Sequence, residues 1–395
     1  MGPYGVHYER SNTWWEDSKA WHQYIARCQY MLRQGRFVAD ALWLQPEEPM
    51  VRLWDRLEAP GYDYDAISPQ AFLKDARVKR GMLDLPSGMK YWLLVLPKGE
   101  SMTPKMLHKI KDLVEAGATV VGRPPVKAPG LSGYPKSDEK IKETAKALWG
   151  SIAPAAAGER KVGKGRVVWG KPVAEVLAAM GVVRDFISSR PMHHIHRDLG
   201  GKDVYFVANP DPQSVEAVCT FRVSGKQPEL WDPMTGEQRD LPEFEQKDGC
   251  TMVPLKFDPS GSMFVVFRRE TRNSKLETGD SSRKNFPEFK PVQEIAGAWS
   301  VQFDPKWSGL TKAVTFDKLD DWAKRPEEAI KYFSGSAVYH KVFDLDAEVG
   351  SRKSEVRTSN SDLRPLSSDL SPRLFLDLGK VAIMVEVKLN GKNLG

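Results

Sequence analysis

Interpretation of this chain starts at residues 4–34, which read YGVHYERSNTWWEDSKAWHQYIARCQYMLRQ. Thr13 is followed three residues later by Glu16, a capping-box pattern that predicts the start of a helix. Apolar side chains then recur at helical spacing and predict one broad apolar face: Trp14, Trp21, Ile25, Cys28 and Leu32. Gly35 follows, and a glycine there is typical of the left-handed residue that ends a helix.

A short polar and aromatic run precedes the predicted helix and contains His7, Glu9 and Arg10, with Trp14 close behind. Sugar sites combine charged groups that bind hydroxyls with rings that stack on the sugar face, so these four residues are candidates for substrate binding. A simpler interpretation is that the tryptophans only anchor the helix, and that Glu9 and Arg10 form a surface pair worth less than about 1 kcal/mol. The local pattern leaves both interpretations open.

The order of residues in this region resembles a known family. The run HYERSNTWWEDSKAW, continued by YIARCQYMLRQGRFVADALWLQPE, resembles the segment just after the catalytic barrel of glycoside hydrolase family 106, the α-L-rhamnosidases. The resemblance is strong over residues 5–47 and 93–150 and extends into the later β regions. It implies that residues 1–35 are the C-terminal remnant of the catalytic (β/α) barrel.

The resemblance also implies a chemistry, the hydrolysis of terminal α-L-rhamnosyl linkages in plant or microbial glycans. The family inverts the anomeric centre, uses two glutamates and needs calcium; inverting enzymes hold the two carboxyl groups about 6.5–9.5 Å apart. By the family pattern both glutamates lie upstream of Gly5, so neither a catalytic residue nor a calcium ligand is assigned in this chain. The alternative is a non-catalytic carbohydrate-binding or scaffold protein.

Composition argues against several classes of function. At 395 residues, 41% hydrophobic and 28% charged, the chain is long enough for about two to four folded domains. The net charge is only +6 and no basic stripe occurs, so we expect no nucleic-acid partner. No apolar stretch reaches about 18 residues, so we expect no membrane span. The 12 tryptophans suit a carbohydrate partner, and several packed cores would also use them.

Residues 36–188 predict an open, doubly wound α/β domain with a parallel sheet and right-handed crossovers. Strands are predicted at 37–45, 91–96, 118–121 and 165–169, and helices at 49–57, from Ser68-Pro69, from Thr103-Pro104, at 140–149 and at 172–180. The resemblance implies a glutamine-amidotransferase-like accessory domain without catalysis of its own. In keeping with this, none of the three cysteines lies within it.

Residues 189–269 change to short strands separated by turns and predict a β-sandwich. His193, His194 and His196 cluster at its start, but no carboxylate or cysteine lies at metal-ligand spacing, and the first two would point apart on a strand. His196 and Arg197, near the domain junction, are candidates for reaching the barrel mouth and binding substrate. A disulfide between Cys219 and Cys250 stays open, and Cys28 is predicted to be a core thiol.

Residues 270–292 are charged and rich in serine and lysine, which predicts a linker. Residues 293–395 predict strands at 299–304, 337–343 and 373–378, and the phrases YFSG, DLG and VKLNG resemble a galactose-binding-like jelly roll, truncated here. Trp299, Trp307 and Trp322 could stack on a glycan, and at least two of them are expected to pack in a core instead.

Both ends predict an internal fragment. The apolar face of the first helix has no preceding element to cover it, and Asn390-Gly391 is a hairpin turn whose returning strand is missing. We therefore expect part of an exported, extracellular or periplasmic enzyme that is inactive as this chain alone, with an oligomeric state that the sequence does not reveal.

Overall fold

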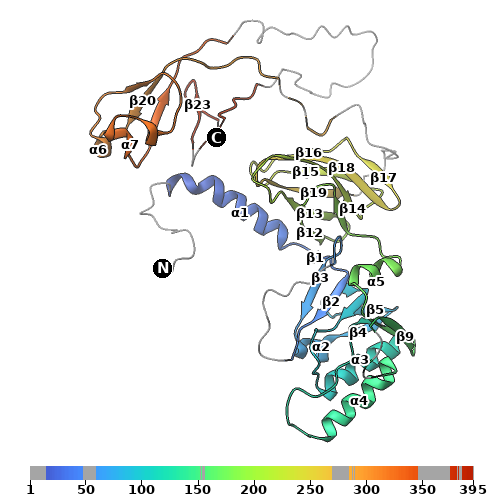
Figure 1. The fold of residues 1–395 in the computed structure, drawn as a ribbon. Coiled ribbons are helices and arrows are strands. Elements are labelled where there is room, and N and C mark those ends of the chain that lie inside the picture. Colours follow the sequence, from blue (N-terminus) through green and yellow to red (C-terminus); the bar gives the residue numbers. More distant parts are fainter. Residues whose placement is uncertain are drawn as a thin grey trace, which may run out of the picture. The chain divides into compact units, whose positions relative to one another are not determined.

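The computed structural model describes residues 15–47, 59–151, 153, 156–268, 284–286, 288, 290–345, 374–379, 381 and 385–394. The chain divides into two compact units, Met1–Ala20 with Glu288–Gly395, and Trp21–Pro287 (Figure 1). Among the described residues, no helix is both long and apolar enough to cross a membrane.

The first helix begins later than the capping box predicts. A 3-10 turn, η1, spans Glu16–Ser18 and α1 spans Lys19–Leu32, while Thr13 lies outside the described residues. Gly35 has a φ of +58°, which confirms the predicted left-handed stop. Its place is also crowded, because a Cβ there would lie 2.1 Å from the carbonyl oxygen of Asp198.

The apolar face of α1 is covered within the second unit. Cys28 is buried against Val204, Phe264 and Val266, and Tyr24, Met31 and Leu32 pack beside it. The prediction that Cys28 is a core thiol is confirmed, and all three cysteines are free. Strands far along the chain therefore cover the C-terminal part of the predicted face, Cys28 and Leu32, whereas Trp21 and Ile25 are only partly buried and Trp14 lies outside the described residues.

A six-stranded sheet with order β3-β2-β7-β8-β10-β9 forms the centre of the α/β region, residues 38–185. Its strands are β2 Ala41–Leu44, β3 Tyr64–Ile67, β7 Leu93–Val95, β8 Thr119–Val121, β9 Gly158–Val162 and β10 Gly165–Trp169. The first five in spatial order run parallel and only β9 is antiparallel. The spatial order of those five, 2-1-3-4-5 in chain order, is that of a doubly wound sheet.

Helices cover both faces of this sheet. Its helices are α2 Pro69–Asp75, α3 Pro104–Ala116, α4 Lys136–Trp149 and α5 Val173–Ala179. Alternate strand residues face opposite sides: Leu42, Leu94 and Val120 pack with α2, α3 and α4, whereas Ala41, Leu93 and Val121 pack with α5. A small antiparallel sheet, β4 Arg77–Lys79, β5 Met82–Asp84 and β6 Lys90–Tyr91, joins α2 to β7.

The chain passes between two sheets where a single strand was predicted at residues 37–45. Arg36–Phe37 forms β1, which pairs with β12 of another sheet, and β2 begins only at Ala41. Between them, the backbone N–H of Asp40 donates to the carbonyl of Asp63. The prediction of one strand is therefore wrong, and the predicted helix at 49–57 lies outside the described residues.

The two-sheet region, residues 186–268 joined by β1, consists of two antiparallel sheets that share one core. One sheet has the order β1-β12-β13-β19-β15-β16 and the other β11-β14-β18-β17. The strands are β11 Phe186–Ser188, β12 His193–Asp198, β13 Asp203–Ala208, β14 Val215–Phe221, β15 Gln227–Trp231, β16 Gln238–Asp240, β17 Glu245–Lys247, β18 Cys250–Phe257 and β19 Ser262–Arg268. Tyr205 and Val207 point into the core, while Val204 and Phe206 face α1.

Residues 284–286 lie against the two-sheet region, although the sequence predicts a linker there. Asn285 is 1% exposed and donates to the carbonyls of Glu243 and Pro254. Phe286 packs beside the core, with the guanidinium of Arg239 5.0 Å from its ring centre. Asn285 and Phe286 are therefore packed against the two-sheet region, and the prediction of a linker over residues 270–292 stays a prediction.

The first unit has a small sheet of order β21-β20-β22, with β20 Trp299–Phe303, β21 Val314–Phe316 and β22 Ala337–His340. Short helical turns α6 Pro305–Ser308, η2 Trp322–Lys324 and α7 Glu328–Lys331 surround it. Trp299 and Trp322 pack against its core, as expected for at least two of the three tryptophans, and Trp307 is 69% exposed.

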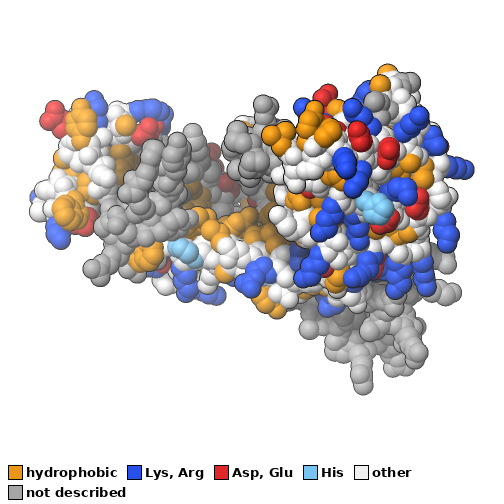
Figure 2. Space-filling view, turned by 90° about the horizontal axis from the view of Figure 1, so that it is seen from below, with side chains coloured by type: hydrophobic (Ala, Val, Ile, Leu, Met, Phe, Trp, Pro, Cys, Tyr) orange, Lys and Arg blue, Asp and Glu red, His pale blue; other side chains and the backbone are white. Residues whose placement is uncertain are grey.

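Two predictions near the C-terminus are wrong. β23 Lys388–Leu389 and β24 Lys392–Asn393 form an antiparallel hairpin around Asn390-Gly391, so the returning strand is present. Leu374–Leu378 shows no strand, and Arg373 lies outside the described residues. Figure 2 shows lysine and arginine side chains scattered over one face among acidic, neutral and apolar ones.

Candidate functional site

Charged side chains gather where the α/β region meets the two-sheet region. Arg222, just after β14, donates from Nη1 to Oδ1 of Asp40 at 2.7 Å, and its Nη2 lies 3.0 Å from Oδ1 of Asp185. The side chains of Asp40 and Asp185 are only 2% and 0% exposed. Arg222 therefore joins two buried carboxylates, one before β2 and one before β11.

His196 on β12 lies between two further carboxylates. Its Nδ1 is 2.9 Å from Oδ1 of Asp185, and its Nε2 is 3.2 Å from Oδ1 of Asp203. The ring stacks on Tyr205 with centroids 3.9 Å apart, and Lys226 pairs with the other oxygen of Asp203. Each polar atom of the imidazole thus has a partner inside the chain.

The environment shifts the pKa values of these groups in opposite directions. Burial alone would lower the pKa of His196, but the hydrogen bonds with Asp185 and Asp203 outweigh burial and raise the pKa to about 8. Burial would raise the pKa of Asp185, yet His196 and Arg222 hold it below its usual value. Burial dominates at Asp40 and raises its pKa despite Arg222. The two carboxylates therefore favour the protonated form of His196 over the neutral form.

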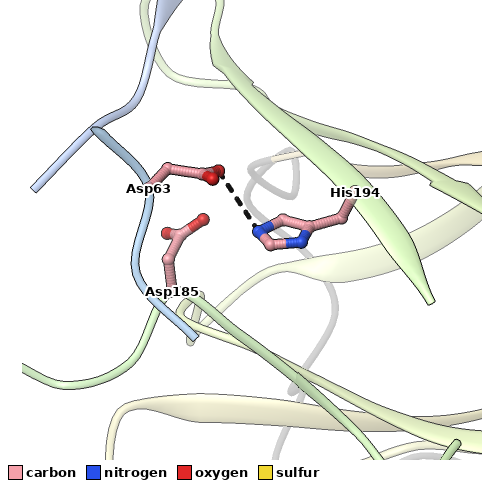
Figure 3. Close-up of side chains that lie close together, drawn as sticks. All are labelled: Asp63, Asp185 and His194. Atoms are coloured by element: carbon pink, nitrogen blue, oxygen red, sulfur yellow. Dashed lines mark ion pairs between the residues drawn. The ribbon is translucent and has the colours of Figure 1, made fainter. Parts of the chain in front are cut away.

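A second cluster lies beside the first and contains Asp63, Asp185 and His194, which point toward one another in Figure 3. One ligand atom from each lies within 4.8 Å of the others, and Nε2 of His194 is 3.2 Å from Oδ2 of Asp63. The ring of Phe186 stacks on His194 at 4.4 Å. Asp63 precedes β3, Asp185 precedes β11 and His194 lies on β12, so three separate segments supply the cluster.

The predicted site residues fall into two groups. His7, Glu9, Arg10 and Trp14 lie outside the described residues. His196 is 3% exposed, and Arg197 donates to the carbonyls of Gln34 and Gly35 beyond the C-terminal end of α1. Both side chains are thus engaged within the chain, and a contact with substrate stays a prediction for all six residues.

The sequence interpretation missed Asp40, Asp63, Asp185 and Arg222. The available signal was weak: Asp40 directly precedes the apolar run Ala41–Leu44, and Asp185 directly precedes Phe186. A carboxylate at the start of a buried strand needs a partner, but nothing nearby in the sequence identifies it. The structure also supplies carboxylates to His194 that are absent from its own stretch of sequence.

Neither cluster offers an open pair of carboxyl groups to a sugar. Asp185 has no exposed surface and is already bound by His196 and Arg222. A surface hollow of about 610 Å³ lies elsewhere on the two-sheet region, lined by Arg190, Asp211, Gln213 and Glu216 among others. Within the described residues, the charged junction therefore has the character of a structural network rather than of an acid–base pair.

Comparison with known proteins identifies the family. A sequence profile described as alpha-L-rhamnosidase, glycoside hydrolase family 106, matches residues 1–246. The chain belongs to this family. The resemblance stated from the order of residues in the first helix is thereby confirmed.

Two individual relatives set the scale of the similarity. The chain is 34% identical over 296 residues to a "Putative beta-glucuronidase" of Formosa agariphila, covering 74% of this chain and 24% of that protein. A solved rhamnosidase from Novosphingobium sp. PP1Y matches with a TM-score of 0.74 and 30% identity, over 88% of this chain and 33% of that one. The chain therefore spans about a quarter to a third of the length of these two relatives.

Proposed function

We propose that this chain is the supporting, non-catalytic part of a glycoside hydrolase that removes terminal α-L-rhamnosyl groups from plant or microbial glycans. The observation that carries the proposal is the similarity to a solved rhamnosidase over 88% of this chain, at a TM-score of 0.74. The buried and mutually paired acidic groups of the described junction agree with chemistry that takes place on other residues.

The proposal assigns a role to each region. The α/β region is a glutamine-amidotransferase-like accessory domain, in keeping with the absence of cysteine from its sequence. The two-sheet region is a β-sandwich that supports the barrel remnant through the face of α1. Residues 293–395 form a galactose-binding-like module, in which the exposed Trp307 offers a ring to a glycan.

We propose calcium only as a cofactor of the full-length enzyme. Calcium takes about six to eight oxygen ligands. The cluster of Asp63, Asp185 and His194 offers two carboxylates and one nitrogen, so it does not fit calcium. No described residue is assigned as a calcium ligand.

The test compares this chain with a longer protein in which the catalytic barrel implied by the family precedes these residues, on aryl α-L-rhamnoside and aryl β-D-glucuronide. We expect the longer protein to release rhamnose with inversion, followed by NMR of the first-formed anomer, and the 395-residue chain to release neither sugar. The relative named a beta-glucuronidase makes the glucuronide the informative control. Cleavage of the glucuronide alone would overturn the substrate, and cleavage by this chain alone would overturn the non-catalytic role.

A further inference from the structure

The junction of the α/β region with the two-sheet region contains two buried polar atoms that pair with each other at 3.2 Å but form no hydrogen bond. Oδ2 of Asp63 and Nε2 of His194 are both inaccessible to solvent, and among the described residues neither has a hydrogen-bond partner. A buried polar atom without a hydrogen bond destabilises the folded state. Two such atoms facing each other need an explanation.

The distance between the two atoms is also compatible with a shared ligand. They are 3.2 Å apart, close enough for an ion pair, but they form no hydrogen bond. Two ligands of one cation, each at about 2.0–2.2 Å from it, lie about 2.8–3.6 Å apart and need no N–H···O alignment. The observed separation falls within that range.

Basic side chains contact three of the four carboxylates at the junction, and His194 contacts the fourth. Arg222, Lys226 and His196 contact Asp40, Asp185 and Asp203. Asp63 lies against His194. Oδ2 of Asp40, on a side chain 2% exposed, is a third atom without a hydrogen-bond partner in this network.

We propose that Asp63, Asp185 and His194 bind one divalent cation of the zinc class, which fastens the α/β region to the two-sheet region. Two carboxylate oxygens and one imidazole nitrogen are a donor set of borderline character that suits zinc. Tetrahedral zinc holds its oxygen and nitrogen ligands about 3.3–3.6 Å apart, so the observed spread of up to 4.8 Å must close by about 1.2 Å or more on binding. Phe186 stacked on His194 fixes the ring, and Arg222 and His196 orient Asp185 from outside.

The test uses the full 395-residue chain, stripped with chelator and then dialysed against Zn²⁺. We expect about one equivalent of bound zinc by elemental analysis, and at least about 100-fold weaker binding in His194→Ala and Asp63→Asn. His193→Ala is the matched control, since His193 is exposed, adjoins His194 and lies on the opposite face of β12. Calcium at the same concentration should not displace the zinc.

X-ray absorption of the zinc-loaded chain keeps the proposal testable if the variants misfold. We expect an oxygen and nitrogen shell that includes one imidazole. A sulfur shell would place the zinc on a cysteine and overturn the assignment. The absence of stoichiometric zinc, displacement of the zinc by equal calcium, or equal losses in the variants of His193 and His194, would also overturn it.

Discussion

Replacing Arg222 by methionine tests whether the charged junction holds the second unit together. The substitution keeps much of the apolar stem and removes the group that lies 2.7 Å from Asp40 and 3.0 Å from Asp185. Asp40 then has no cation, while Asp185 keeps His196 and Tyr205. Removing one member of a buried ion pair costs about 3–5 kcal/mol, because the remaining charge is left uncompensated in a poorly solvated site.

We expect the lower end of that range, about 3 kcal/mol, since Arg222 is itself 22% exposed and Asp185 retains partners. The assay is equilibrium urea unfolding at pH 7, followed by tryptophan fluorescence. Lys256→Ala is the control: its pair with Glu216 is 53% and 76% exposed and should be worth less than about 1 kcal/mol.

A double-mutant cycle measures the coupling between Asp40 and Arg222. Adding Asp40→Asn to Arg222→Met removes the orphaned carboxylate, so we expect the double variant to regain about 1–2 kcal/mol relative to Arg222→Met alone. If Arg222→Met were as stable as Lys256→Ala, the buried pairs would contribute little. If the two changes were additive, Asp40 and Arg222 would not be coupled in the folded protein.

Three further predictions concern stability and reactivity. Gly35→Ala should destabilise the protein by more than about 3 kcal/mol in thermal unfolding, because the added Cβ would lie 2.1 Å from the carbonyl oxygen of Asp198. Gly225→Ala is the control: Gly225 also has a positive φ, but no atom lies within 4 Å of an added Cβ, so the substitution should cost only about 1 kcal/mol. Asn285→Ala should cost about 2–3 kcal/mol in urea unfolding by breaking buried hydrogen bonds to Glu243 and Pro254, and a cost as small as that of Lys284→Ala would contradict the fixed position of residues 284–286. Burial raises the pKa of Cys219 to about 11, so only about one Cys219 thiol in a thousand is ionised at pH 8. In single-cysteine variants we therefore expect Ellman's reagent to modify Cys250, which is only partly buried, well before Cys219. Equal rates would show that Cys219 is accessible.

The helices of the α/β region were predictable because their signals are local. Ser68 and Thr103 cap α2 and α3 through their hydroxyl oxygens, each followed by a proline in the first turn. Gly117 ends α3 at a φ of +125°. Such contacts involve residues only a few positions apart, so their chemistry appears directly in the sequence.

The path of the chain between sheets was not predictable in the same way. Residues 37–45 have the composition of one buried strand, and no local feature shows that β1 pairs with β12 while β2 pairs with β3 and β7. The break occurs where Asp40 is held by the backbone of Asp63 and by Arg222, which are distant in the sequence. Strand pairing across such distances is a tertiary choice, and composition does not encode it.

The order and spacing of neighbouring residues were enough to establish the family, the caps of α2 and α3, and the alternation of strands and helices in the α/β region. What packs against α1, and which carboxylates surround His194 and His196, became known from the folded structure. The physical reason is that burying a charge demands a partner without saying where along the chain it lies. Asp63, Asp185 and His194 come together because the packing of two regions places their separate segments side by side.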